Sequence, residues 1–322
     1  MNQLIESIEK YDRIAILGHI RPDGDCIGST LALFNYINRN YPDKTARVFL
    51  QEADAKFGLL TGFDRIVHEC PGDDEVYELV ICLDASDPAR LDYFTPVYQR
   101  AELTVNVDHH ITNPNYTDIR FLEAGASSTC EVLFGLLDPD KIDADIASCL
   151  YLGIVHDSGL FCYSCTSPET LRIAAFLMEK GVDFVRIDSE TFLVKSALAR
   201  KLEALAFSKA EMYFGGRVIF SYITEEEMAS YHAKSKDLDA IVSEMRETEG
   251  VECSIFLYPL NAGGYKGSLR SQYFINVSEI AQSFGGGGHV RAAGFNVTGS
   301  IGETRDKILA RIGEQFDRCD HT

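Results

Sequence analysis

The chain has 322 residues, of which 46% are hydrophobic and 25% charged, and its formal net charge is −19. Because domains commonly hold roughly 100–200 residues, this length suggests two globular domains. So acidic a chain is poorly suited to the broad basic surface that holds long nucleic acids. A small anionic ligand remains compatible with the charge, since a few local cations or metal ions can bind it.

Signals for membranes, secretion and disulfides are absent from the sequence. No apolar run approaches the ~20 residues of a membrane span, and the first residues, MNQLIE, lack the basic and apolar regions of a secretory signal. Nine cysteines, an odd number, do not suggest a disulfide framework. The single C-x-x-C at 162–165 has no second ligand pair for zinc. We therefore expect a cytoplasmic protein.

The first half of the chain alternates between strand-like and helix-like segments. Short apolar runs predict buried strands, and longer periodic segments predict helices. The expected strands are 13–18, 46–50, 79–83 and 103–107, and the expected helices are 27–37, 127–137, 144–155 and 168–180. This alternation predicts a mostly parallel sheet with helices on both faces, in which ligands bind beyond the carboxyl ends of the strands.

The second half of the chain has a different pattern. A mostly polar stretch at 183–205 is expected to be helical and to connect two domains. Beyond it we expect a hairpin at 212–223, a helix at 238–246, strands at 251–260 and 267–274, a helix at 277–283 and a closing helix at 304–316. The fold class is thus α/β, with an N-terminal domain at 1–185, a helical linker at 186–205 and a smaller α/β domain at 206–322.

Acidic residues and histidines gather at four places, each at or just beyond the end of an apolar segment. They are His19, Asp23 and Asp25 after the first strand, Asp84 after the third, Asp108, His109 and His110 after the fourth, and His156 and Asp157 ending a helix. If these clusters converge, their carboxylates repel one another unless a cation balances them. Carboxylates and imidazoles suit Mn²⁺ or a similar divalent ion. Two ions ~3.5–4 Å apart can activate a water molecule for phosphoryl transfer.

Each cluster also has a simpler explanation when it is taken alone. The segment 23–25 could form a turn, Ser29 could cap the following helix, and Asp84 could be an ordinary loop acid. Adjacent histidines also occur by chance. The coincidence of all four clusters at the ends of elements favours a metal site over these alternatives.

The order of these motifs resembles that of the DHH phosphoesterase superfamily. The pattern H-x-x-x-D-x-D-x-x-G-S, a strand-end Asp, D-H-H and a helix-end D-x-G occur in the family's order. The second half is similar to the family's associated C-terminal domain in Gly267-Ser-Leu-Arg270-Ser271 and in the segment 285–294, GGGGHVRAAG. The resemblance implies a catalytic metal-binding domain at 1–185, a substrate-binding domain at 206–322 and an active site in the cleft between them.

The resemblance also implies two metal ions, expected to be Mn²⁺, with Mg²⁺ and Co²⁺ as alternatives. The first ion would be bound by His19, Asp23 and Asp84. The second would be bound by Asp25, Asp84, His109 and Asp157, so that Asp84 bridges the two ions. Where many relatives have Thr before the last acid, this chain has His156, which could add a ligand, position the phosphate or do neither.

Further residues are implied to act on the substrate. Asp108 would orient a ligand imidazole, and His110 would contact the scissile phosphate or act as acid to the leaving oxygen. The residues implied to bind a second phosphate or the nucleotide's end are Arg270, Ser271, Gly287, Gly288 and His289. An Arg side chain matches phosphate oxygens, and a glycine run lets backbone N–H groups approach an anion. The glycine run alone could equally be a plain turn.

Within the family, the two-domain organisation resembles the bifunctional oligoribonuclease and 3′-phosphoadenosine 5′-phosphate (pAp) phosphatase group. This implies hydrolysis of RNA or DNA oligonucleotides of about two to five nucleotides to mononucleotides, dephosphorylation of pAp, or both, in a site of small-ligand size. The alternatives are a phosphodiesterase for linear or cyclic dinucleotides, a manganese-type pyrophosphatase and a non-catalytic nucleotide-binding regulatory module. Neither long nucleic acid nor a membrane is expected as a partner, and a homodimer stays open.

Overall fold

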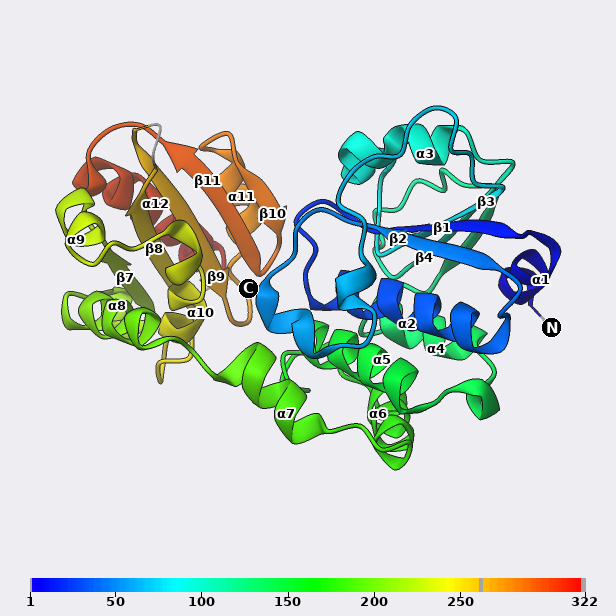
Figure 1. Cartoon of the computed structure of the whole chain (residues 1–322). Coiled ribbons are helices and arrows are strands. Elements are labelled where there is room, and N and C mark those ends of the chain that lie inside the picture. Colours follow the sequence, from blue (N-terminus) through cyan, green and yellow to red (C-terminus); the bar gives the residue numbers. More distant parts are fainter. Residues whose placement is uncertain (1, 261–262, 320–322) are drawn as a thin grey trace. The chain divides into compact units, whose positions relative to one another are not determined.

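The computed structural model describes residues 2–260 and 263–319, and the chain divides into two compact units, Met1–Val194 and Lys195–Thr322. The two units are described separately below (Figure 1). Within the described residues, no helix combines the length and the apolar character needed to cross a bilayer.

A five-stranded parallel sheet forms the centre of unit 1. Its strands are β1 (Arg13–Leu17), β2 (Thr45–Phe49), β3 (Leu79–Leu83), β4 (Leu103–Asp108) and β5 (Ile119–Leu122), in the order β2-β1-β3-β4-β5. All residues of β3 are buried, as expected for a central strand covered on both faces. The strand order reverses between β1 and β3, and ligands of such sheets bind beyond the carboxyl ends of the strands at this point.

Helices cover both faces of this sheet (Figure 1). They are α1 (Gln3–Lys10), α2 (Gly24–Asn40), α3 (Thr95–Gln99), α4 (Thr129–Leu136) and α5 (Ala144–Asp157). Helices α6 (Pro168–Glu179) and α7 (Phe184–Asp188) pack against α5. Alternate residues of β1 point to opposite faces. Ile14 and Ile16 join the core beneath α1, α2, α4 and α5, whereas Ala15 and Leu17 pack with Val97 of α3 on the other face.

Two glycines allow α2, α4 and α5 to pack closely. A Cβ atom at Gly28 would lie 2.6 Å from the carbonyl oxygen of Cys149, and one at Gly153 would lie 2.2 Å from Cys130 Sγ. Both distances are shorter than a van der Waals contact, so larger residues would force the helices apart. This packing brings the beginnings of α2 and α4 together with the end of α5.

Unit 2 contains a six-stranded mixed sheet with helices on both faces. Its strands are β6 (Glu211–Tyr213), β7 (Val218–Tyr222), β8 (Cys253–Pro259), β9 (Tyr265–Ser271), β10 (Gly287–His289) and β11 (Ala292–Val297), in the order β10-β11-β9-β8-β7-β6. Its helices are α8 (Ala197–Ser208), α9 (Glu225–Ser230), α10 (Ile241–Arg246), α11 (Val277–Gln282) and α12 (Ile301–Cys319). Strands β7 and β8 are parallel, and the other pairs are antiparallel.

The predicted parallel sheet and the smaller second α/β unit are confirmed, but two expectations need correction. The stretch 183–205 is not one helix, because α7 passes into a π-helical turn at Ser189–Leu193 and Val194 is extended. Helix α8 begins afresh after Ser196, whose hydroxyl accepts the N–H of Ala199 at 3.0 Å. The glycine run is not only a turn, since residues 287–289 form β10 and pair with β11.

Candidate active site

His19 lies two residues beyond the end of β1 and is buried. Its Nδ1 atom is 2.8 Å from the carbonyl oxygen of Ile20, which can only accept, so Nδ1 carries the hydrogen. Its Nε2 atom lies 3.5 Å from Asp23 Oδ1 and 3.3 Å from Asp84 Oδ2. Asp23 is the N-cap of α2, whereas Ser29, which we weighed as a cap, lies inside the helix and donates to the carbonyl oxygen of Asp25.

Asp25 is completely buried beside the first turn of α4. Its Oδ2 atom accepts the N–H of Thr129 at 2.6 Å, and its Oδ1 atom accepts the N–H of Cys130 at 2.9 Å. The first N–H groups of a helix lack partners within the helix and favour a negative charge. The sequence prediction missed Thr129 and Cys130, although the serines at 127–128 before an apolar run are an N-cap signal.

Asp84 connects the other clusters. It follows β3 with a positive φ of 55°, a conformation that is uncommon outside glycine and recurs at functional sites. Its Oδ1 atom accepts the hydroxyl of Thr129 at 3.1 Å and lies 3.8 Å from His109 Nε2 and 3.6 Å from His110 Nδ1. Its Oδ2 atom faces His19, so one oxygen of Asp84 lies toward His19 and the other toward His109 and His110.

Asp108 is buried beneath the two histidines that follow it. Its Oδ1 atom accepts the backbone N–H groups of His109 and His110, at 2.8 and 3.2 Å, and lies 2.7 Å from His110 Nδ1. Its Oδ2 atom accepts a hydrogen bond from Nδ2 of Asn113 at 2.6 Å. The ring that Asp108 orients is therefore that of His110, whereas Nδ1 of the predicted ligand His109 faces the carbonyl oxygen of Ala126 at 3.4 Å.

Asp157 ends α5 and lies with its Oδ2 atom 3.2 Å from His109 Nε2. The neighbouring His156 points elsewhere, and its Nε2 atom is 2.9 Å from Thr191 Oγ1. A Cβ atom at Gly24 would lie 2.2 Å from Cγ of His156, so the ring packs against the start of α2. Burial lowers the pKa of His156 to about 4, and its ring therefore stays neutral at pH 7. Its contacts indicate packing, not ligation.

Three carboxyl groups of the cluster have pKa values above those of carboxyl groups in water. Burial raises the pKa of Asp25 to about 7 and those of Asp84 and Asp157 to about 6, with contributions from neighbouring carboxylates. Burial disfavours the charged imidazolium, yet nearby carboxylates raise the pKa values of His19 and His109 to about 10. In each histidine the nearby carboxylates therefore stabilise the protonated ring, and a metal ion can bind an imidazole nitrogen only after that nitrogen loses its proton.

The donor atoms fit divalent cations. Among the residues that the structure describes, three groups have ligand atoms within 4.8 Å of one another: His19, Cys26 and Asp84; Asp84, His109 and His110; and Asp25, His109 and Asp157. Burial raises the pKa of the Cys26 thiol well above its ordinary value, so this group keeps its proton. The remaining oxygen and imidazole donors suit Mn²⁺, Mg²⁺ or Co²⁺. Buried like charges of this density are stable only when a cation or protons compensate them.

The predicted substrate-binding residues of unit 2 lie at one end of its sheet. In the strand register, Ala292 of β11 is paired with Arg270 on one side and His289 on the other. Gly288 has a φ of 143°, and a Cβ atom there would lie 2.5 Å from the carbonyl oxygen of Ala292. Only glycine fits this position without strain. The side chain of His289 lies outside the described part of the structure.

Ser271 is buried, unlike Arg270, Gly287 and Gly288. Its hydroxyl donates to the carbonyl oxygen of Ile275 at 2.6 Å and thereby holds the loop that follows β9. Arg270 donates from Nη1 to the carbonyl oxygen of Leu269 at 3.0 Å.

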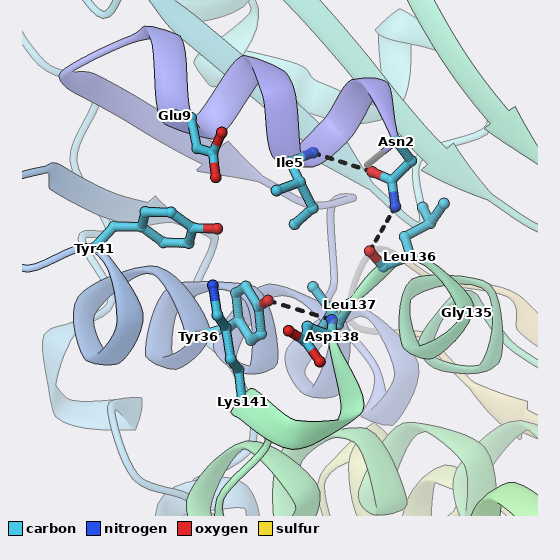
Figure 2. A pocket seen from close by; sticks show the side chains of 10 residues that line it. All are labelled: Asn2, Ile5, Glu9, Tyr36, Tyr41, Gly135, Leu136, Leu137, Asp138 and Lys141. Atoms are coloured by element: carbon cyan, nitrogen blue, oxygen red, sulfur yellow. Dashed lines mark hydrogen bonds between the residues drawn. The ribbon is translucent and has the colours of Figure 1, made fainter.

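A pocket of 330 Å³ in unit 1 contains none of the predicted site residues (Figure 2). Tyr36, Tyr41 and Lys141 line it beside the end of α2. Because Tyr36 lies 12 residues beyond Gly24 in α2 and a helix rises ~1.5 Å per residue, this pocket is roughly 18 Å from the beginning of the helix. Asn2 closes one side by donating to the carbonyl oxygen of Leu136 at 2.7 Å (Figure 2). The pocket is thus separate from the acid and histidine cluster.

Comparisons with known proteins match both units. Residues 13–154 match the DHH family, N-terminal domain, and residues 215–317 match the DHHA1 domain. The chain is 30% identical to the probable bifunctional oligoribonuclease and PAP phosphatase NrnA of Streptococcus mutans, over 94% of this chain and 95% of that protein. It is 28% identical to the bifunctional oligoribonuclease and PAP phosphatase NrnA of Thermus thermophilus, over 95% of this chain and 91% of that protein.

A solved structure has the same fold. The crystal structure of an exopolyphosphatase-related protein from Bacteroides fragilis superposes with a TM-score of 0.88 at 24% identity, covering 97% of this chain and 94% of that one.

Proposed function

Because the chain belongs to the DHH family of phosphoesterases, we propose that it hydrolyses phosphate esters of short oligonucleotides and small nucleotides. The substrates would be RNA or DNA of about two to five nucleotides, cleaved to mononucleotides, and pAp, a size range that suits a small-ligand site. The observation that carries the proposal is the gathering of His19, Asp84, His109 and Asp157 from four separate segments. The names of both relatives support this substrate class.

The proposed cofactor is a pair of divalent ions, with Mn²⁺ expected. One ion would be held by His19, Asp23 and Asp84, and the other by Asp25, Asp84, His109 and Asp157. When bound, such ions supply an activated water molecule and neutralise the charge that develops on the phosphoryl group.

The chain's own residues prepare this site in three ways. The carbonyl oxygen of Ile20 fixes the hydrogen of His19 on Nδ1 and so directs Nε2 into the site. The first turn of α4 holds the Asp25 carboxylate in place through two backbone N–H groups. Asp108 fixes the ring of His110, which is proposed to contact the scissile phosphate or to protonate the leaving oxygen.

Substrate length would be limited by a second anchoring point in unit 2. Arg270, Gly287, Gly288 and His289 are proposed to bind a second phosphate or the nucleotide's end. Ser271 would support them by holding the adjacent loop, since its hydroxyl is already bonded to Ile275. A cytoplasmic location and a homodimeric assembly stay predictions from the sequence.

The proposal can be tested by assaying the purified chain with Mn²⁺ against a substrate panel. The panel holds pAp, RNA of graded length, linear and cyclic dinucleotides, and inorganic pyrophosphate. We expect turnover of pAp or of the shortest RNAs, and a loss of about 100-fold or more in Asp84→Ala. The exposed Asp140 serves as control, since Asp140→Ala should keep full activity.

Each outcome of the panel has a meaning. Preference for cyclic dinucleotides would favour a signalling phosphodiesterase, and preference for pyrophosphate would favour a pyrophosphatase. No turnover of any substrate, together with unchanged nucleotide binding in Asp84→Ala, would favour a non-catalytic module and refute the proposal.

A further inference from the structure

The loop 272–275, which follows β9, is fixed by charged side chains of unit 2. The carboxylate of Glu252, which is 4% exposed, accepts the backbone N–H groups of Tyr273, Phe274 and Ile275 at 2.9–3.2 Å. The guanidinium group of Arg291 donates to the carbonyl oxygen of Ile275 at 2.8 Å and to that of Tyr273. A buried carboxylate is costly unless it is hydrogen-bonded, so the loop and Glu252 stabilise each other.

This fixed loop presents two aromatic rings to solvent. Tyr273 is 73% exposed and Phe274 is 40% exposed. Phe274 packs edge to face on Phe316, with ring centroids 5.5 Å apart. A single exposed aromatic residue is ordinary on a protein surface. Because a buried carboxylate and a guanidinium group already hold the backbone of Tyr273, a ligand that stacks on its ring does not have to order the loop.

The rings line a pocket of 500 Å³ together with two cationic side chains. Arg217 and Arg246 contribute the guanidinium groups, and Glu247, Glu249 and the loop-binding Glu252 also line the pocket. This volume suits a ligand of nucleotide size. Aromatic rings beside guanidinium groups are the combination with which proteins bind single-stranded nucleic acids, by stacking on bases and neutralising phosphates.

Tyr273 is also close in the chain to the proposed phosphate-binding residue. It follows Arg270 by three residues, which can span at most about 10 Å when fully extended. A nucleotide whose phosphate lies at Arg270 therefore has its base within reach of the Tyr273 ring.

We propose that Tyr273 stacks on the base of the nucleotide whose phosphate Arg270 binds, an inference that rests on the proposed function. The pocket beside it takes the nucleoside of that nucleotide. Unit 2 thereby selects nucleotides over base-free phosphates such as pyrophosphate, and it reads the presence of a base without reading its identity, because every base has a stacking face.

The test compares the Michaelis constant of wild-type protein and Tyr273→Ala for a dinucleotide and for two analogues, each lacking one of the bases. For the intact dinucleotide we expect KM to rise about 5-fold to 150-fold with kcat little changed, which is ~1–3 kcal/mol at 1.4 kcal/mol per tenfold. For the analogue without the stacked base, the same substitution should leave KM unchanged. Tyr273→Phe should retain the wild-type KM, since it keeps the ring.

The control is Tyr231→Ala, which removes another partly exposed tyrosine of unit 2 and should change no kinetic constant. An equal rise in KM for the dinucleotide and both analogues would overturn the inference, as would an unchanged KM in Tyr273→Ala. Neither of these two results would contradict the proposed function. Failure of the wild-type protein to cleave any nucleotide would instead refute the proposed function, and the inference would fall with it.

Discussion

Replacing Asp108 with Asn should lower both the stability of unit 1 and the turnover number. The carboxylate accepts three hydrogen bonds at Oδ1 and one at Oδ2. If the amide oxygen takes the place of Oδ1, the amide nitrogen faces Nδ2 of Asn113, donor against donor at 2.6 Å. If the amide turns over, its nitrogen faces the N–H groups of His109 and His110. Neither orientation reproduces the native contacts.

The magnitude follows from the less costly orientation. In that orientation the variant loses one hydrogen bond to a charged acceptor and leaves buried donors unsatisfied. Together these losses lower the free energy of unfolding by about 3 kcal/mol. For the 194 residues of Met1–Val194, this lowers the unfolding midpoint by roughly 6–12 °C. Because His110 then contacts a neutral amide, kcat should fall about 10-fold to 100-fold with little change in KM.

Thermal unfolding followed by circular dichroism and steady-state kinetics with Mn²⁺ measure the two effects. Asp140→Asn, at an exposed position, is the matched control and should behave as wild type. An Asp108→Asn variant that melts within about 2 °C of wild type and keeps its kcat would show that Asp108 does not hold His110 in the working position.

Three further predictions concern packing, metal binding and pH. Gly153→Ala would bring a methyl group within 2.7 Å of Asp25 Oδ1 and should destabilise unit 1 by ~1–3 kcal/mol, whereas Gly135→Ala meets open space and should not; equal unfolding midpoints would contradict this. Chelation of divalent ions should lower the unfolding midpoint, and adding Mn²⁺ at 100 times its Kd should raise the free energy of unfolding by about 2.7 kcal/mol. An unfolding midpoint that does not change with Mn²⁺ would argue against a resident ion. Although burial opposes it, hydrogen bonds from Lys209 and the Thr224 N–H lower the pKa of Glu227 below 4.5. A lowered carboxyl pKa stabilises above pH 4.5 and loses its effect as pH falls through the lowered value, so Glu227→Gln should be less stable than wild type at pH 7 and match it in acid; an equal deficit at pH 7 and pH 3 would refute this.

The parallel sheet and the sheet edge at which the acids gather could be predicted from the sequence, because each strand is a short apolar run whose end is visible in the local sequence. Asp84 could be placed after a buried apolar run, and the strand order then put it beside His19. The short strand β5 was missed, since its residues IRFL are only partly buried and show no clear alternation. The break before Ser196 was missed although the sequence carries local signals for it, since Val194 is β-branched and Ser196 is a typical N-cap residue.

The supporting contacts of the site could not be predicted, because they join residues far apart in the chain. The N–H group of Thr129 binds Asp25 across 104 positions, and no local pattern encodes that pairing. The orientation of His156 likewise depends on its packing against Gly24 and its bond to Thr191. Which histidine Asp108 orients depends on the turn after β4, where Oδ1 contacts His110.

The most direct measurement is anomalous scattering at the manganese edge from crystals of the full chain grown with Mn²⁺. We expect two peaks beside Asp84, one within bonding distance of His19 Nε2 and the other within bonding distance of His109 Nε2 and Asp157. Absence of any peak among these side chains, in crystals of a protein that hydrolyses nucleotides with Mn²⁺, would contradict the proposed metal site.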